Sequence, residues 1–178
     1  MSSDSLTNSH NKGCGGAGAS AAITAADCGQ KVLIVDRYDG GGSTRRSGGV
    51  VYFGGGTDLQ SASNVTDSVS QMFRYISKEN GGVSKPETIR RFCEESASNF
   101  RWLEQRCQVR FRDERGNVKV YPDKTSYPPS DISLYRSGNE TTSTPRGHRV
   151  LGEYLTGNIL YEALHKQLEN HPNITIAT

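Results

Sequence analysis

Gly13-Cys-Gly-Gly-Ala-Gly18 is the stretch from which the fold class follows. It matches the pattern G-x-G-x-x-G, in which the first glycine allows a tight turn, the second lets the backbone approach a diphosphate, and the third lets a helix pack closely on a strand. The free N–H groups at the start of that helix then bind phosphate oxygens. The motif therefore predicts a dinucleotide contact, made by Gly13, Gly15, Gly16, Ala17 and Gly18.

The residues after the motif supply the helix and strand that such a turn requires. Small side chains predict a helix over residues 17–28, and Gly29 is a typical helix end. Residues 31–36, Lys-Val-Leu-Ile-Val-Asp, indicate a short parallel strand that is buried on both faces. Asp36 ends this strand at roughly the spacing where an acidic side chain accepts hydrogen bonds from the adenosine ribose.

The residues before the motif do not look like the strand that should precede it. Residues 8–12 read Asn-Ser-His-Asn-Lys, whereas the first strand of such a sheet is apolar. We therefore predict that residues 1–12 are disordered and that the first strand is missing. The expected fold is α/β, a partial doubly wound, Rossmann-like domain over residues 13–178.

A second glycine-rich segment follows the predicted strand. Residues 37–49 read Arg-Tyr-Asp-Gly-Gly-Gly-Ser-Thr-Arg-Arg-Ser-Gly-Gly, and the strand-like run Val50–Phe53 comes next. A flexible linker would not carry that run, so the glycines indicate a need for special backbone geometry. Glycine lets a backbone contact a flat ring, and Ser and Thr add hydrogen bonds without bulk.

These two segments together resemble the fumarate reductase/succinate dehydrogenase flavoprotein family, which follows its ribose-binding acid with G-G-x-[ST]-x-x-S-G-G. The resemblance implies an FAD-binding domain with FAD as cofactor. The segment that begins at Arg37, residues 37–49, is implied to be the second contact of the domain with FAD. The residues implied to approach the FAD diphosphate are Gly41, Gly42, Ser43 and Thr44, and those implied to run beside the isoalloxazine ring are Ser47, Gly48 and Gly49. Arg45 and Arg46 either help to neutralise the diphosphate or point to solvent.

Within that family the chain is most similar to the 3-oxosteroid dehydrogenase branch. The similarity rests on residues 47–57, 125–131, 134–140 and 145–148. In such enzymes a ketosteroid is oxidised by hydride transfer to flavin N5, and a tyrosine helps to remove the accompanying proton. Tyr121, Tyr127 and Tyr135 are the candidates for that tyrosine; the alternative is that they pack or hydrogen-bond within their proline-rich loop.

Periodicity predicts the remaining elements. Further helices are expected over residues 66–79, 86–107 and 156–169, a hairpin from 109–111 and 118–120, a long loop over 121–150, and a strand over 173–177. Arg146, His148 and Arg149 form a polar cluster before the last helix. This cluster is either a substrate or flavin-phosphate contact, or a solvated loop that positions the helix.

Composition excludes several partners. A formal net charge of +2 is too small to indicate nucleic-acid binding, and no apolar run has the length of a membrane helix. The four cysteines form no C-x-x-C pair and no His stands at zinc spacing, so we expect no metal site. Residues 1–12 lack the apolar stretch of a signal peptide, and these features together favour the cytoplasm.

Three interpretations of the function stay open. The first is an FAD-dependent oxidoreductase with a small-molecule substrate, a steroid in the branch that the chain resembles. The second is a non-catalytic remnant, or one half of a split flavoprotein completed by another chain, because the family's substrate cap and further flavin contacts lie, by resemblance, beyond residue 178. The third is an NAD-binding domain, which Asp36 permits but residues 40–49 disfavour. We expect the isolated chain to be inactive and to hold FAD weakly or not at all.

Overall fold

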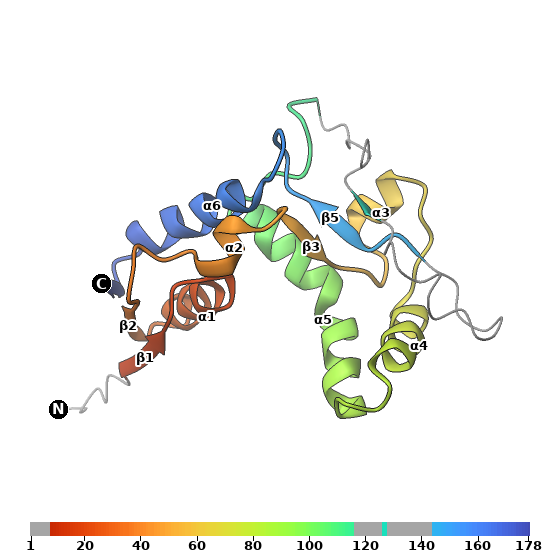
Figure 1. Ribbon diagram of the computed structural model, residues 1–178, viewed down its shortest axis with the longest axis horizontal. Helices are drawn as coiled ribbons and strands as arrows, with labels where there is room; N and C mark the ends of the chain where they lie inside the picture. Colours follow the sequence, from red (N-terminus) through yellow and green to blue (C-terminus); the bar gives the residue numbers. More distant parts are fainter. Residues whose placement is uncertain (1–7, 116–125, 128–143) are drawn as a thin grey trace. The chain divides into compact units, whose positions relative to one another are not determined.

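The computed structural model describes residues 8–115, 126–127 and 144–178 (Figure 1). The chain divides into two compact units. The first unit comprises Met1–Gly49 with Gly152–Thr178, and the second comprises Val50–Leu151. The first unit is therefore discontinuous in sequence, because the residues of the second unit come between its two segments along the chain.

A parallel sheet lies at the centre of the first unit. Its strands are β1 (Asn8–Lys12), β2 (Lys31–Val35) and β6 (Ile174–Ala177), in the order β1-β2-β6. Ile34 is fully buried in β2 and pairs with Asn11 on one side and Ile176 on the other. Parallel strands flanked by helices confirm the α/β class, and β2 confirms the strand predicted after the motif.

The prediction that residues 8–12 are disordered, and that the first strand is missing, is wrong. These residues form β1 and pair in parallel along the whole of β2. Ser9 to Lys12 are half-buried or exposed, so their polar side chains lose little hydration. Backbone groups make the pairing, and Asn11 Nδ2 also donates to the carbonyl oxygen of Gly18 at 2.6 Å. Hydrophobicity therefore could not reveal this strand.

Helices cover the sheet of the first unit. They are α1 (Gly16–Asp27), α2 (Gly42–Arg46) and α6 (Gly157–Glu169), and α6 packs against both α1 and α2 (Figure 1). The buried face of α1 is made of Ala19, Ala22, Ile23 and Ala26. The three alanines of this face let the helix approach the sheet closely. The predictions of helices over 17–28 and 156–169 are confirmed.

The second unit combines antiparallel strands with helices. Its strands β3 (Val50–Tyr52), β4 (Ser126–Tyr127) and β5 (Gly147–Arg149) are ordered β3-β5-β4, and its helices are α3 (Asp58–Ala62), α4 (Val69–Asn80) and α5 (Pro86–Gln105). Phe100 of α5 lies in the core, with its ring centroid 5.0 Å from that of Phe111 and 4.8 Å from that of His148. The predictions of helices over 66–79 and 86–107 are confirmed.

Two predictions for this unit need correction. The loop expected over residues 121–150 contains β4 and β5. Its residues gave no strand signal because β5 buries Gly147 and the imidazole of His148 rather than aliphatic side chains. Val109 and Phe111 are buried but form no strand, and the other half of the expected hairpin, 118–120, lies outside the described residues.

Candidate functional site

The glycine turn between β1 and α1 is the first part of the candidate site. Gly13 adopts φ 96°, which favours glycine, and its N–H donates to the carbonyl oxygen of Val35 at 2.8 Å. Gly15 is the N-cap residue of α1, and the first turn of that helix has no acidic side chain. The turn therefore presents the positive end of a twelve-residue helix, and no carboxylate in the first turn of that helix neutralises it.

Asp36 lies against this turn from the end of β2. Its Oδ2 accepts from the Cys14 N–H at 2.6 Å, and its Oδ1 accepts from the Tyr38 N–H at 2.9 Å. These two backbone hydrogen bonds, led by that from Cys14, lower the pKa of Asp36 below its ordinary value. The carboxylate is therefore ionised at neutral pH and fixed beside the turn, as the spacing in the sequence predicts.

The second glycine segment folds back onto the first. The Gly41 N–H donates to the carbonyl oxygen of Cys14 at 2.8 Å, and the Gly16 N–H donates to Thr44 Oγ1 at 3.0 Å. Gly41 adopts φ 86° as it enters α2. The structure thus brings residues 13–18, Asp36 and residues 41–44 together, as expected if one ligand contacts all three.

The Ser-Gly-Gly run ends against α6. The Gly157 N–H donates to the carbonyl oxygen of Ser47 at 3.1 Å, and the Thr156 N–H donates to that of Gly48 at 3.3 Å. A Cβ atom on Gly49 would lie 2.2 Å from Thr156 Oγ1, and its φ is 71°. Close packing on α6 therefore requires glycine at position 49, independently of any ligand.

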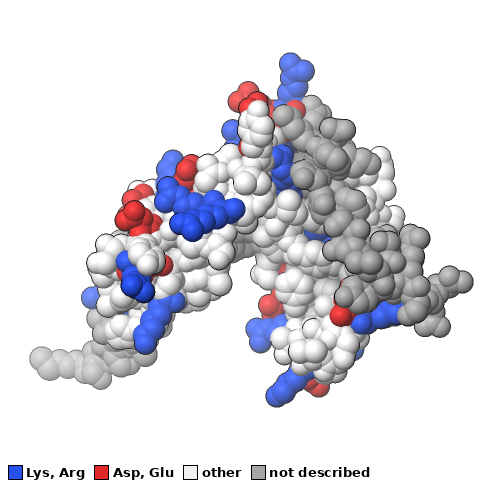
Figure 2. Space-filling view, viewed as in Figure 1, with Lys and Arg blue, Asp and Glu red and all other residues white. Residues whose placement is uncertain are grey.

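Basic residues of the second segment lie on the surface. Figure 2 shows Lys and Arg side chains gathered over α2, whose Arg45 and Arg46 are exposed. Arg37 is also exposed, and its guanidinium lies 5.5 Å from the ring centroid of Tyr38. The structure therefore places Arg37 beside Tyr38 at the surface.

The glycines separate into those that the chain itself requires and those that it does not. A Cβ atom on Gly18 would lie 2.0 Å from the carbonyl oxygen of Gly13, so packing alone excludes any side chain there. Gly15 has φ −83°, and a Cβ atom there would make an ordinary contact of 3.7 Å with the carbonyl oxygen of Gly41. At Gly48 the φ is not positive, and no atom of the described residues, its chain neighbours apart, lies within 4 Å of a built Cβ.

Packing among the described residues therefore does not require glycine at position 15 or at position 48. A ligand that contacts the backbone at both positions would require it, because a Cβ atom would fill the space that the ligand needs. This fits a molecule with a diphosphate at the turn and a flat group further along. The residues present thus fit a dinucleotide cofactor.

A cavity of about 230 Å³ lies beside Asp36. It is lined by residues at the carboxyl ends of β2 and β6 and by α6, among them Cys14, Asp36, Gly40, Tyr161 and Ile176. Open parallel sheets bind their ligands at this edge. The cavity therefore extends the glycine turn on the side where a ribose would meet the carboxylate.

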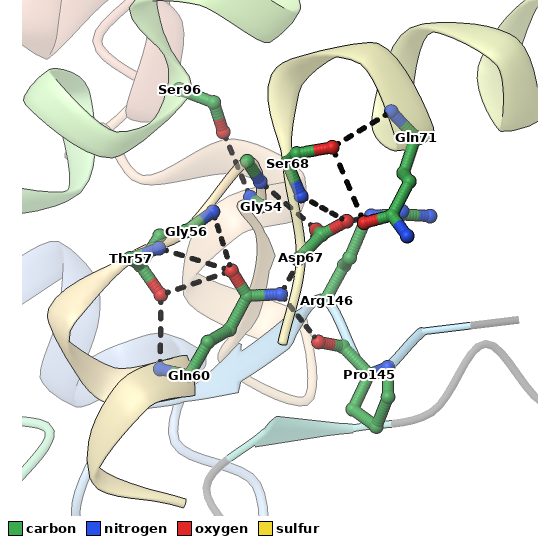
Figure 3. A network of polar contacts seen from close by, with 11 residues as sticks. Gly54, Gly56, Thr57, Gln60, Asp67, Ser68, Gln71, Ser96, Pro145 and Arg146 are labelled. Atoms are coloured by element: carbon green, nitrogen blue, oxygen red, sulfur yellow. Dashed lines mark hydrogen bonds and ion pairs between the residues drawn. The ribbon is translucent and has the colours of Figure 1, made fainter. Parts of the chain in front are cut away.

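The polar cluster before α6 has a different role from either prediction. Arg146 is fully buried in the second unit, and its Nε and Nη2 donate to Asp67 at 2.8 and 2.7 Å (Figure 3). Gln60 Nε2 donates to Asp67 Oδ2 at 3.1 Å and to the carbonyl oxygen of Pro145 at 2.8 Å. A solvated loop is therefore wrong for Arg146, and its full burial leaves no surface for a substrate.

His148 is also fully buried, which a solvated loop would not produce. Its Nδ1 lies 3.0 Å from the carbonyl oxygen of Arg146, and its Nε2 lies 2.7 Å from Thr57 Oγ1. Because a carbonyl oxygen only accepts, Nδ1 carries the proton and Nε2 accepts from Thr57. Burial lowers the pKa of His148 to about 4, so the imidazole is neutral and structural at neutral pH.

The candidate tyrosines remain a prediction. Tyr121 and Tyr135 lie outside the described residues, and only the backbone of Tyr127 is described, paired with Gly147 in the β-ladder. Among residues 8–115, 126–127 and 144–178, no three His, Cys, Asp or Glu side chains gather where they would hold a metal ion. No helix in those same ranges has the length and apolar character needed to cross a membrane.

Comparison with known families and sequences agrees with this geometry. Residues 13–178 match the family described as FAD binding domain. The chain is 38% identical over 172 residues to the 3-oxo-5-alpha-steroid 4-dehydrogenase of Comamonas testosteroni, covering 89% of this chain and 31% of that protein. It is 33% identical over 93 residues to a fumarate reductase (cytochrome) of Shewanella frigidimarina, covering 51% of this chain and 16% of that protein.

Solved structures give the same relationship. The chain resembles a 3-ketosteroid-delta4-(5alpha)-dehydrogenase from Rhodococcus jostii RHA1, solved with 4-androstene-3,17-dione, with a TM-score of 0.78 and 27% identity over 99% of this chain and 40% of that one. A flavocytochrome c3 fumarate reductase shares the fold, with a TM-score of 0.72 and 24% identity over 96% of this chain and 26% of that one. The chain thus spans about a third of the length of the steroid dehydrogenase that it matches in sequence.

Proposed function

Since this chain belongs to the FAD binding domain family, we propose that its two glycine segments hold FAD in a flavin-dependent oxidoreductase. FAD is the cofactor of the family, as the resemblance in the sequence implied, and this disfavours the alternative of an NAD-binding domain. The observation that carries the proposal is the unexplained space at Gly15 and Gly48. Both positions lie where the resemblance places FAD contacts.

Each part of the site has a role in this proposal. The N–H groups at the start of α1, other than that of Gly16, which donates to Thr44, hold the diphosphate, and Gly41 to Thr44 lie beside them. Asp36 accepts hydrogen bonds from the ribose. Ser47 and Gly48 run beside the flavin ring, where Gly48 leaves room for a planar group.

The proposed reaction is oxidation of a 3-oxosteroid, the substrate class in the name of the Comamonas testosteroni relative. When bound, FAD supplies the acceptor for a hydride from the substrate. The accompanying proton passes to a tyrosine, for which Tyr121, Tyr127 and Tyr135 stay the candidates. Because the chain spans 31% of that relative, we assign the substrate contacts other than this tyrosine to residues outside this stretch, in the same or a complementing chain. We take the stretch as part of a larger doubly wound domain. Four free cysteines support a cytoplasmic location.

The presence of β1 changes what we expect of the isolated chain. Weak FAD binding was expected because a turn without its first strand would be tethered on one side only. The turn is instead held by β1 and by α1, so less backbone has to be ordered when the ligand binds. We therefore expect measurable FAD binding by residues 1–178 and, because the other substrate contacts lie outside this stretch, no steroid oxidation.

Equilibrium dialysis of the purified chain against FAD and against NAD tests the proposal. FAD is expected to bind more tightly, with a shift in the flavin visible spectrum on binding. Gly29→Asn is a suitable control, because this glycine lies beyond the other end of α1, has φ 84°, and has no atom within 4 Å of a built Cβ. Asn tolerates that conformation, so FAD binding should be unchanged. Tighter binding of NAD, or no binding of FAD, would contradict the proposal.

A further inference from the structure

Tyr161 of α6 reaches into the first glycine segment. Its side chain is buried, and its hydroxyl donates to Cys14 Sγ at 3.3 Å. Cys14 stands between Gly13 and Gly15 in the turn that we assign to the diphosphate. The backbone of Cys14 is at the same time bound to Asp36 and Gly41. Tyr161 therefore touches the residue on which the parts of the site converge.

The same side chain also sets the path of the second glycine segment. A Cβ atom on Gly40 would lie 2.1 Å from the Tyr161 hydroxyl, and one on Gly41 would lie 3.0 Å from its ring. Both glycines have positive φ, 75° and 86°, so the backbone bends around the aromatic ring. One residue of α6 is thus packed against two segments that are more than twenty positions apart in sequence.

We propose that Tyr161 is a positioning residue for the cofactor. It fixes the separation between the turn at Cys14 and the bend at Gly40, and hence the spacing of the N–H groups that face the diphosphate. It acts through these two residues, because only 2% of its own surface is exposed. This inference rests on the proposed function and adds a residue of α6 to the two glycine segments that the sequence indicated.

The chemistry of the contact suits a site for a dianionic group. Burial is the main cause that raises the pKa of the Cys14 thiol, and burial together with the Cys14 contact raises the pKa of Tyr161. Both groups therefore stay neutral, and neither adds a negative charge beside the diphosphate. The contact keeps its form across the pH range in which the cofactor would bind.

Tyr161→Phe tests the inference directly. It keeps the ring and removes the hydroxyl, so we expect FAD and ADP to bind about fivefold more weakly, the usual effect of one neutral hydrogen bond. Leu168→Val is the matched control, since Leu168 is fully buried near the other end of α6. A purely structural role predicts a lower melting temperature with unchanged dissociation constants, which is the expected result for Leu168→Val only.

A second substitution provides a rescue experiment. Gly40→Ala brings a Cβ atom to 2.1 Å from the Tyr161 hydroxyl, whereas the next atom, Cζ, lies at 3.2 Å. The strain of positive φ is the same with or without that hydroxyl, so it cancels when the two backgrounds are compared. Gly40→Ala should therefore weaken FAD binding at least about threefold less in the Tyr161→Phe background than in the wild type.

The outcomes separate this inference from the proposed function. If the wild-type chain binds FAD while Tyr161→Phe has no effect and Gly40→Ala has the same effect in both backgrounds, the positioning role is refuted and the function stands. If the wild-type chain binds neither FAD nor ADP, the proposed function is refuted and the positioning role with it. If the Gly40→Ala chain fails to fold, Tyr161→Phe decides alone: weaker FAD binding supports the inference, and an unchanged dissociation constant refutes it.

Discussion

Gly15→Ala should abolish most FAD binding without disturbing the fold. The wild-type φ of −83° and ψ of −172° are accessible to alanine, and the added methyl group would make contacts of 3.7 Å with the Gly41 carbonyl oxygen and 3.9 Å with Thr44 Oγ1. These are ordinary van der Waals distances. The folded chain therefore has room for the methyl group, and only a ligand at the backbone would collide with it.

The expected magnitudes differ clearly between binding and stability. A methyl group that pushes the diphosphate away from the helix start removes at least one hydrogen bond to a charged group, worth about 1.5–3 kcal/mol, or roughly 10- to 150-fold in dissociation constant. Alanine is a poorer N-cap residue than glycine, which costs at most about 1 kcal/mol and lowers the melting temperature by roughly 2–4 °C in a chain of this length.

Gly18→Ala is the matched comparison, three positions further along the same motif. Its methyl group would lie 2.0 Å from the carbonyl oxygen of Gly13, so strand, turn and helix would have to move apart. Overpacking of this kind costs about 1–3 kcal/mol or more, and it should appear as a large loss of melting temperature.

FAD titration by fluorescence and thermal melting of both variants give the answer. The reasoning is refuted if Gly15→Ala binds FAD as the wild type does, or if its melting temperature falls as far as that of Gly18→Ala.

Three further predictions concern other parts of the structure. Because the pKa of His148 is about 4 in the folded chain and about 6.5 in the unfolded chain, the unfolded chain binds the extra proton between these values. The stability of the wild type should therefore fall by about 3 kcal/mol as pH drops from 6.5 to 4, and urea melts of His148→Gln should lack this pH dependence. Asp67→Asn leaves the buried Arg146 charge without its partner and should cost about 3–5 kcal/mol, measured by urea unfolding, whereas replacement of both residues by apolar ones should cost less. Gly48→Ala should leave the melting temperature unchanged, since its Cβ has no neighbour within 4 Å, but should alter the visible spectrum of bound flavin; an unaltered spectrum would remove Gly48 from the site.

The parts of the site that are local in sequence could be predicted from it. The turn at Gly13 to Gly18, the strand that ends at Asp36 and the bend before α2 each depend on residue types within a few positions, and the structure brings all three together. Glycine, acid and small hydroxyl residues carry this information because their backbone and hydrogen-bonding properties are specific.

Contacts between distant residues could not be predicted in this way. Asp67 and Arg146 are 79 positions apart, and Tyr161 meets Cys14 across 147 positions. No periodic pattern or motif in the sequence links the two members of either pair. The β1 strand was missed for a related reason, since its pairing with β2 depends on backbone groups while its side chains stay polar.

The discontinuity of the first unit has a consequence for the order of events during synthesis. The second unit, Val50–Leu151, is contiguous and can fold as soon as it leaves the ribosome, since domains generally fold as units from the N-terminal side. β2 can pair with β1 early, but its other edge must wait for β6, because Ile34 also pairs with Ile176. Tyr161 also arrives late, so the nascent chain exposes an incomplete glycine turn while the second unit forms. Pairing over so long a loop is slow, and the cofactor site should mature after the second unit.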